Sequence, residues 1–392
     1  MATMIGKGWE IPVFTEEEGM KRWKNVREKM QAREIDCLVI SGTLDKYRGS
    51  FSDIRYLTNF ITWMGDEYCV FPVKEDPTLY LWASQHLYWA KKVSWVKDIV
   101  LTPLTTMAGD VVKKIKSLGL ERGTIGIVSQ RTMLAHFYSY LMKELPNANF
   151  VEAGDILRAA RLIKSPAELE YVRKAGECAD LGFKAMAEVA RPGITEYQLI
   201  SACEAAMISN GAECGSFSLF NSKQWPDGWG FPVNGTYRQL QKGDVILNEL
   251  TPCYGGYYVQ LCRPISLGKP SADFVEMSEI HKVMYQMGRD GFRAGNVLSE
   301  VDAKVSEYAL SKRPFTRASA TFQLMDSPHE EVYVDFTLRP GMAFQIHPWT
   351  NPPEADMKAE KNHMGHIYGD TCIVTEGDPE CVSKLPMEVT IV

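Results

Sequence analysis

The chain has 392 residues, of which 45% are hydrophobic and 23% charged, with a formal net charge of −6. This length suits two domains that each bury a core, and this composition excludes disordered and fibrous classes. The charge forms no basic stripe, no apolar run approaches a membrane span, and residues 1–14 lack a signal-peptide core. We therefore expect a cytoplasmic protein that binds neither nucleic acid nor membrane.

The nine cysteines are scattered and form no C-x-x-C pair. This usage favours reduced, mostly buried thiols over a disulfide framework or a zinc site. Cys253 and Cys262 flank a hairpin, so a nucleophilic thiol is an alternative. No histidine stands near them in the sequence pattern to activate such a thiol.

Residues 1–160 alternate between helix and strand patterns. Thr15 and Glu18 form a capping box that predicts a helix to about Arg33, and the strand DCLVISG follows. Further patterns predict strands near 67–73, 78–82 and at TIGIVS, with helices near 107–117 and 132–145. This alternation indicates an α/β domain.

Residues 161–392 form a second predicted domain, which begins at RLIKSPAELEYVRKAGECAD. Ser165 as N-cap, Pro166 at the first helical position and Glu168 predict a strong helix start. Strand patterns follow near 217–220, 245–265, 342–350 and 366–375, and helices on one side of a mostly antiparallel sheet would make this domain α+β. Two later helix starts show the same capping pattern, at Thr195 with Gln198 and at Ser299 with Asp302.

The stretch VILNELTPCYGGYYVQLCRPI predicts a hairpin over 245–265. If Gly255-Gly256 is a two-residue turn, Tyr254 faces Tyr257 and Glu249 faces Cys262. Glu249 and Gln260 then lie diagonally on one face. Pro252 predicts a bulge or an edge in this hairpin.

Five segments, taken in order, resemble the creatinase and aminopeptidase P branch of the pita-bread (M24) family. They are DIRYLTNF, RLIKSPAELEYVRKA, KGDVILNELTP with YYVQLCRPI, LRPGMAFQIHP, and GDTCIVTEGDPECVSKLP. The resemblance covers nearly the whole chain. It implies a creatinase-like α/β N-terminal domain, an α+β pita-bread C-terminal domain, and a homodimer in which the partner's N-terminal domain approaches the active site.

Metallopeptidases of this family bind two divalent ions with two Asp, one His and two Glu. Carried across, these ligand positions fall on Glu249, Gln260, a residue at or near Ala320, His347, and Gly369 with Asp370 beside it. One carboxylate offsets too little of the charge of two cations. A single ion on Glu249 and His347 would lack the third protein ligand that catalytic zinc usually has. We therefore expect no metal and no other cofactor.

The resemblance to creatinase, a metal-free relative, implies hydrolysis of a carbon–nitrogen bond by a His with glutamates. The matching His position falls on Phe231 or Pro232, so the creatinase base is absent. His347 is the best substitute as a proton carrier. Glu249 could act as a base, share a proton with His347 or pair with a cationic substrate, unless it forms a salt bridge to Arg263. Asp370 is a third catalytic candidate.

The substrate-binding candidates are residues near these positions or matched by the resemblance. Aromatic rings there could cage a cation, although such rings are often core. His329 resembles a pocket His of the family but could lie on a surface loop, and His363 and His366 have the spacing of a metal pair without flanking acids. The full set is Gln260, Arg263, Tyr258, His329, His366, Trp225, Trp349 and, from a partner subunit, Arg55.

The sequence thus predicts a metal-independent, creatinase-like enzyme that cleaves a carbon–nitrogen or similarly activated bond of a small molecule by His/Glu acid–base chemistry. Three alternatives stay open. They are a lyase or decarboxylase acting on an aromatic or cationic small molecule, an Xaa-Pro metallopeptidase with rearranged ligands, and a non-catalytic pita-bread binding module.

Overall fold

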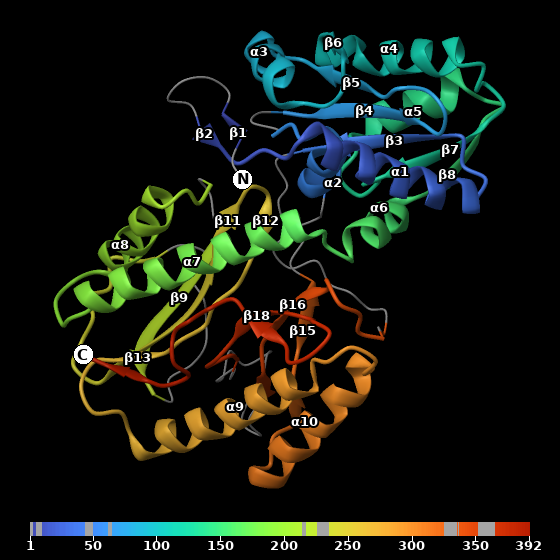
Figure 1. Cartoon of the computed structure of the whole chain (residues 1–392). Helices are drawn as coiled ribbons and strands as arrows, with labels where there is room; N and C mark the ends of the chain where they lie inside the picture. The colour runs from blue at the N-terminus through green and yellow to red at the C-terminus, as the bar shows by residue number, and fades with distance from the viewer. Residues whose placement is uncertain are drawn as a thin grey trace. The chain divides into compact units, whose positions relative to one another are not determined.

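The computed structural model describes residues 3–4, 10–43, 50–61, 65–213, 217–225, 235–324, 335, 337–351 and 365–392. The chain divides after Leu162 into two compact units, which Figure 1 shows coloured along the sequence. None of the helices within these ranges is both long and apolar enough to cross a bilayer.

The N-terminal unit alternates helices and strands, as the sequence predicts. Its helices are α1 (Glu16–Ala32), α2 (Ser50–Thr58), α3 (Ser84–Val93), α4 (Leu104–Ser117), α5 (Ala135–Glu144) and α6 (Gly154–Arg161). Its strands are β1 (Thr3–Met4), β2 (Glu10–Ile11), β3 (Cys37–Gly42), β4 (Glu67–Pro72), β5 (Thr78–Leu81), β6 (Asp98–Leu101), β7 (Thr124–Val128) and β8 (Asn149–Glu152).

A six-stranded mixed sheet in the order β6-β5-β4-β3-β7-β8 forms the centre of this unit. Alternate residues of a strand point to opposite faces. Cys37 and Val39 of β3 pack with α4 and α5 in one apolar cluster, while Leu38 and Ile40 are fully buried on the other face. The sheet is therefore covered on both faces, as expected for an α/β domain.

The C-terminal unit combines two pairs of helices with short, mostly antiparallel strands. Its helices are α7 (Pro166–Val189), α8 (Glu196–Ser209), α9 (Ala272–Gly291) and α10 (Leu298–Lys312). Its strands are β9 (Phe217–Gln224), β10 (Asp244–Thr251), β11 (Cys253–Tyr254), β12 (Tyr257–Tyr258), β13 (Ile265–Ser266), β14 (Arg317–Ser319), β15 (Phe322–Leu324), β16 (Ala343–Ile346), β17 (Trp349–Asn351), β18 (Asp370–Ile373), β19 (Glu380–Cys381) and β20 (Thr390–Ile391).

Two four-stranded sheets, β20-β13-β10-β9 and β15-β16-β18-β19, form the centre of the C-terminal unit. A bridge between Cys262 and Gly369 joins the hairpin segment to the strand that leads into β18. This bridge matters for function, because it brings together segments that are far apart in the sequence.

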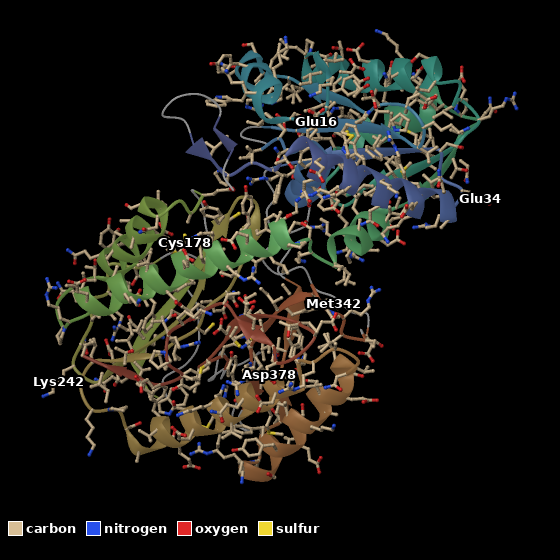
Figure 2. The ribbon with its side chains drawn as sticks, viewed as in Figure 1. Glu16, Glu34, Cys178, Lys242, Met342 and Asp378 are labelled. Atoms are coloured by element: carbon tan, nitrogen blue, oxygen red, sulfur yellow. The ribbon has the colours of Figure 1, made fainter. Side chains whose placement is uncertain are left out.

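The two helix pairs pack against opposite faces of β10. Ile246 and Leu250 belong to the apolar cluster of α7 and α8, which includes Cys178, labelled in Figure 2. Val245 and Leu247 belong to the cluster of α9 and α10. The prediction that the helices lie on one side is therefore wrong, because β10 is apolar on both faces and needs cover on each.

Three of the four predicted helix starts are confirmed. The side chain of Thr15 caps α1 by accepting from the Glu18 N–H, and Ser165 and Thr195 cap α7 and α8 by reciprocal side-chain and backbone hydrogen bonds. The fourth prediction is wrong, because α10 already begins at Leu298. The Ser299 hydroxyl donates to Asp335 instead, and a carboxylate oxygen of Asp302 accepts from the Ser319 hydroxyl.

The hairpin has the predicted register. Tyr254 pairs with Tyr257 across the Gly255-Gly256 turn, and Leu250 bridges to Leu261 further along. Pro252 separates β10 from β11, in line with the predicted interruption. The register leaves Glu249 opposite Cys262, with its side chain on the β10 face that holds Val245 and Leu247.

Candidate functional site

Glu249 is a buried carboxyl group in the middle of β10, only 4% exposed. Its Oε1 lies 3.7 Å from Nε2 of His347 and 3.9 Å from Nε2 of His366. Burial disfavours the charged form and raises the pKa of Glu249 to about 8. This carboxyl group can therefore gain or lose a proton near neutral pH.

His347 follows β16 and is held by its backbone and by a thiol. Its N–H donates to the carbonyl oxygens of Ala320 and Thr321, and its Nε2 lies 3.3 Å from Sγ of Cys262. Burial raises the pKa of Cys262 well above its usual value, so the thiol stays protonated. When the thiol donates to Nε2 of a neutral His347, Nδ1 carries the ring proton.

His366 stacks on His347, with ring centroids 3.0 Å apart. Its Nδ1 lies 3.0 and 3.1 Å from the carbonyl oxygens of His347 and Pro348, which fixes Nδ1 as a donor. Nε2 is the ring nitrogen that faces Glu249. The ring of Trp349 packs edge-on against His366 at 4.6 Å. The predicted residues His347, His366, Glu249 and Trp349 thus form one cluster.

Gln260 lies beside Glu249 in a network of neutral side chains. Its Nε2 atom donates to Thr251 at 3.0 Å and approaches Oε2 of Glu249 at 3.4 Å. The side chain of Gln345 donates to Oε1 of Gln260. Where the resemblance implies a second carboxylate, this chain therefore has an amide with protein partners.

Gly369 has no side chain, and atoms of neighbouring residues occupy the space that a side chain would need. A Cβ atom at this position would lie 3.0 Å from Cδ2 of His347, 3.1 Å from Sγ of Cys262 and 3.3 Å from Nε2 of Gln345. A glutamate side chain cannot extend through these atoms unless they move. The last family ligand position therefore offers neither a carboxylate nor room for one.

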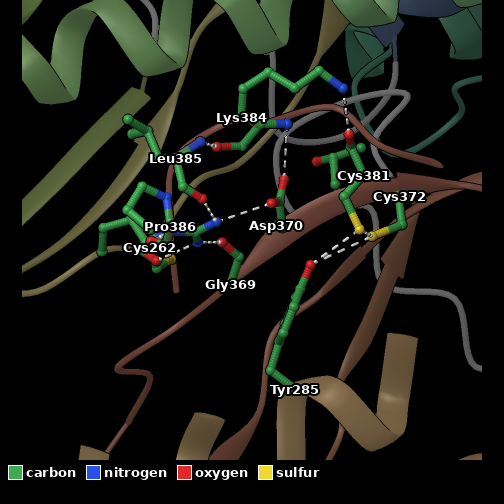
Figure 3. Close-up of polar contacts among 12 residues, drawn as sticks. Cys262, Tyr285, Gly369, Asp370, Cys372, Cys381, Lys384, Leu385 and Pro386 are labelled. Atoms are coloured by element: carbon green, nitrogen blue, oxygen red, sulfur yellow. Dashed lines mark hydrogen bonds and ion pairs between the residues drawn. The ribbon is translucent and has the colours of Figure 1, made fainter. Parts of the chain in front are cut away.

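Asp370, which is labelled in Figure 3, forms a buried ion pair with Arg263, whose Nη2 lies 3.0 Å from its Oδ2. Burial raises the pKa of Asp370 to about 6, and the charge of Arg263 opposes that rise. The remaining donors of Arg263 bind the carbonyl oxygens of Cys262, Gly369, Leu385 and Pro386. The alternative of a Glu249–Arg263 salt bridge is wrong, and all five donors of this predicted substrate ligand have protein partners.

Other predicted site residues lie elsewhere. Trp225 donates its Nε1–H to Asp273 of α9 and packs against Phe274, so it belongs to the core of the α9 side. Tyr258 is buried in a small cluster with Cys253. Arg55 is buried in the N-terminal unit. His329, His363 and the Phe231–Pro232 position lie outside the described residues.

Sequence reasoning missed the contact between Cys262 and His347 and the role of Gln345. The hairpin register already placed Cys262 opposite Glu249, and Gln345 of β16 precedes His347, which follows that strand, by two residues. The period-two alternation of strand residues therefore indicated which side chains share a face. The sequence did not indicate the bridge between Cys262 and Gly369, which places β18 beside the hairpin.

A two-cation centre does not fit these residues. Within the part of the chain that the structure describes, Glu249 is the one carboxylate at the cluster, since Asp370 is bound to Arg263. A single cation fits better, because Glu249, His347 and His366 offer three ligand atoms within 4.8 Å of one another. The expectation that a third protein ligand is missing is therefore wrong.

Comparison with known proteins covers both units. Residues 22–163 match the Creatinase/Prolidase N-terminal domain. Creatinase from Bacillus sp. (strain B-0618) is 23% identical over 96% of this chain and 92% of its own length. Probable dipeptidase PepE from Mycobacterium bovis is 29% identical over 62% and 64%. The Xaa-Pro dipeptidase from Bacillus anthracis shares the fold, with a TM-score of 0.77, 24% identity, and coverage of 95% of this chain and 100% of that one.

The family assignment follows from the C-terminal unit. Residues 170–376, more than half of the chain, match the model of one family, and this region contains every residue of the Glu249 cluster. The chain belongs to metallopeptidase family M24, with the creatinase/prolidase type of N-terminal domain.

Proposed function

We propose that the protein is a creatinase-like hydrolase that cleaves a carbon–nitrogen, or similarly activated, bond of a small molecule without a metal ion. The observation that carries this proposal is the buried contact between Glu249 and the imidazoles of His347 and His366. A carboxyl group with a pKa of about 8 at 3.7 Å from an imidazole Nε2 suits proton transfer near neutral pH.

In this mechanism Nε2 of His347 gives up its contact with the weak thiol donor of Cys262 and accepts a proton from water as the water oxygen attacks the substrate carbon. The imidazolium or the protonated Glu249 then gives a proton to the departing nitrogen, so the released amine leaves neutral. Cys262 and Gly369 hold His347 in place, while Gln260 and Gln345 supply fixed amide groups beside the carboxyl group. Burial strengthens each of these interactions.

A second candidate is a hydrolase with one divalent cation, which the three converging ligand atoms favour. Glu249, His347 and His366 would hold the ion, and a bound ion of this kind lowers the pKa of a coordinated water.

A substrate screen in the presence of a chelator tests the proposal. Guanidino acids, N-acyl amino acids and Xaa-Pro dipeptides would be incubated with the full-length protein, and release of amine would be measured. We expect turnover of one class with EDTA present and its loss in His347→Asn. Turnover that appears only after manganese, cobalt or zinc is added would replace the proposal with the one-cation candidate.

The quaternary structure is part of this proposal. The resemblance implies a homodimer in which the partner's N-terminal domain, with Arg55, approaches the active site. Size-exclusion chromatography with light scattering measures the mass, and mixing an Arg55→Ala protein with a His347→Asn protein tests for shared sites. Regained activity in the mixture supports a shared site, and additive loss contradicts it.

A further inference from the structure

Two thiols face each other across the β18–β19 pair. Cys372 and Cys381 are directly opposite partners in this antiparallel pairing, and their Sγ atoms lie 2.6 Å apart (Figure 3). Neither thiol has a part in the proposed hydrolysis. Any chemistry of this thiol pair is therefore independent of the proposed function.

The backbone pairing places these residues where a cross-link can form. The N–H of Val382 donates to the carbonyl oxygen of Thr371, so Thr371 and Val382 form a hydrogen-bonded pair. The next pair, Cys372 and Cys381, is then of the non-hydrogen-bonded kind, whose Cα atoms lie about 4.5 Å apart with the side chains close together. Disulfides span Cα separations of about 4.4–6.8 Å, so β18 and β19 need little movement to be joined.

The two sulfur atoms differ in access and in acidity. Cys372 is buried, whereas Cys381 is partly exposed. A hydrogen bond from Cys372 lowers the pKa of Cys381, with help from the charge of Arg289, while burial raises the pKa of Cys372 well above its usual value. The hydroxyl of Tyr285 lies 3.2 Å from Sγ of Cys381. Cys381 is therefore the attacking thiol, and Cys372 is the resolving one.

We propose that Cys372 and Cys381 form a redox modification site, at which a low-molecular-weight disulfide such as oxidised glutathione is reduced and a reversible Cys372–Cys381 disulfide is formed. The Cys381 thiolate attacks one sulfur of the reagent and displaces a thiolate, which leaves a mixed disulfide on Cys381. The sulfur of Cys372 then attacks Sγ of Cys381 and displaces the second thiolate. The two protons lost by the cysteines pass to the two released thiols, so the exchange balances.

A Cys372–Cys381 disulfide would restrain the backbone segments that hold the Arg263–Asp370 ion pair. Asp370 precedes Cys372 by two residues on β18 and accepts from Arg263. The segment that follows Cys381 supplies the carbonyl oxygens of Leu385 and Pro386 to the same guanidinium group. A cross-link between β18 and β19 joins the two sides of this network. We expect the Val382 amide to exchange hydrogen more slowly in the oxidised protein.

The test uses the full-length protein treated with oxidised glutathione, then alkylated and mapped by peptide mass spectrometry. We expect loss of the two alkylatable thiols of Cys372 and Cys381, a peptide that links them, and recovery of both thiols with dithiothreitol. Peptide mapping distinguishes the thiols of Cys372 and Cys381 from that of Cys214, which lies outside the described residues. Slower exchange at Val382 should accompany the link.

Three variants distinguish this route from nonspecific oxidation. Cys372→Ser should accumulate glutathione on Cys381, because the resolving thiol is gone. Cys381→Ser should leave Cys372 unmodified, because Cys372 is buried. Cys203→Ser, which removes a buried thiol of α8, should form the link as the unaltered protein does. Glutathione that stays on Cys381 in the unaltered protein, or alkylation of both thiols after treatment, would overturn the proposal.

Discussion

Glu249 and Asp370 are both buried carboxyl groups of the C-terminal unit, yet their partners differ. Asp370 faces a guanidinium group that cannot lose its charge at ordinary pH, and that group is anchored to four backbone carbonyl oxygens. Glu249 faces two imidazoles and an amide. The first arrangement fixes a charge as part of the fold, whereas the second leaves a proton free to move. The comparison thus separates a structural acid from a candidate catalytic one.

The largest expected effect is a loss of activity when His347, the proposed proton carrier beside Glu249, is replaced. His347→Asn should lower kcat/KM by about 10²–10⁴-fold, the usual contribution of general acid–base catalysis. Steady-state kinetics with the substrate from the screen measures this loss. His281→Asn is the matched control, since it removes a buried imidazole bonded to Thr350 outside the cluster. Equal losses in both variants would mean that His347 acts through the fold alone.

The structural acid predicts a large effect on stability. Arg263→Met leaves Asp370 buried without its cation and should lower the free energy of unfolding by about 3–5 kcal/mol, as for other broken buried pairs. Urea denaturation followed by circular dichroism measures it. Because a lone buried carboxyl group can be neutralised, Arg263→Met/Asp370→Asn should recover part of the loss. A double variant that is less stable than Arg263→Met would show that the unpaired charge of Asp370 is not the cause of the loss.

The comparison also predicts how stability changes with pH. Glu249 has a pKa of 4.5 when exposed and about 8 when folded, so the folded state holds its proton over a range in which the unfolded chain loses it. The group therefore contributes stability below about pH 4.5, and this contribution is lost as pH rises towards 8, at about 1.4 kcal/mol per pH unit.

Glu249→Gln removes the pH-dependent contribution of Glu249 to stability. Tm of this variant should therefore fall less between about pH 4.5 and 8 than Tm of the unaltered protein. Asp370→Asn should change the slope less and at lower pH, since the pKa of Asp370 rises only from 3.8 to about 6. Differential scanning calorimetry from pH 4 to 9 compares the three proteins. Parallel curves for the unaltered protein and Glu249→Gln would show that Glu249 does not titrate in this range.

The smallest effect concerns the space around His347. Gly369→Ala places a methyl group 3.0 Å from Cδ2 of His347, and such overpacking costs about 1–3 kcal/mol. We expect a lower Tm and a reduced kcat with little change in KM, because the imidazole shifts. Gly377→Ala, in an exposed turn, is the control. An unchanged kcat in Gly369→Ala would show that His347 tolerates displacement.

Much of the fold could be predicted from the sequence, because its signals are local. The capping pattern at Ser165 and the Gly255-Gly256 turn each specify their structure within a few residues. The cap prediction at Ser299 failed because α10 begins one residue earlier, at Leu298, with Val297 as its N-cap. The two-sided cover of β10 was missed because buried strands on both faces lack the alternation that one-sided cover produces.

The candidate site was harder to predict than the fold, because its contacts join distant segments. The resemblance identified Glu249 and His347 by position. It did not reveal that His366 would stack on His347, that Cys262 would donate to it, or that Asp370 would be bound to Arg263. These contacts depend on how β16 and β18 pack beside the hairpin, and no local sequence pattern predicts that arrangement.

The central claim is that protein side chains alone handle the proton at Glu249, and the binding of divalent ions tests it most directly. The full-length protein, purified without chelator, would be analysed for metal content and titrated with zinc, manganese and cobalt while Tm is measured. We expect far less than one ion per chain and no rise in Tm. One tightly bound ion per chain, with a rise in Tm that His366→Ala abolishes, would contradict the claim.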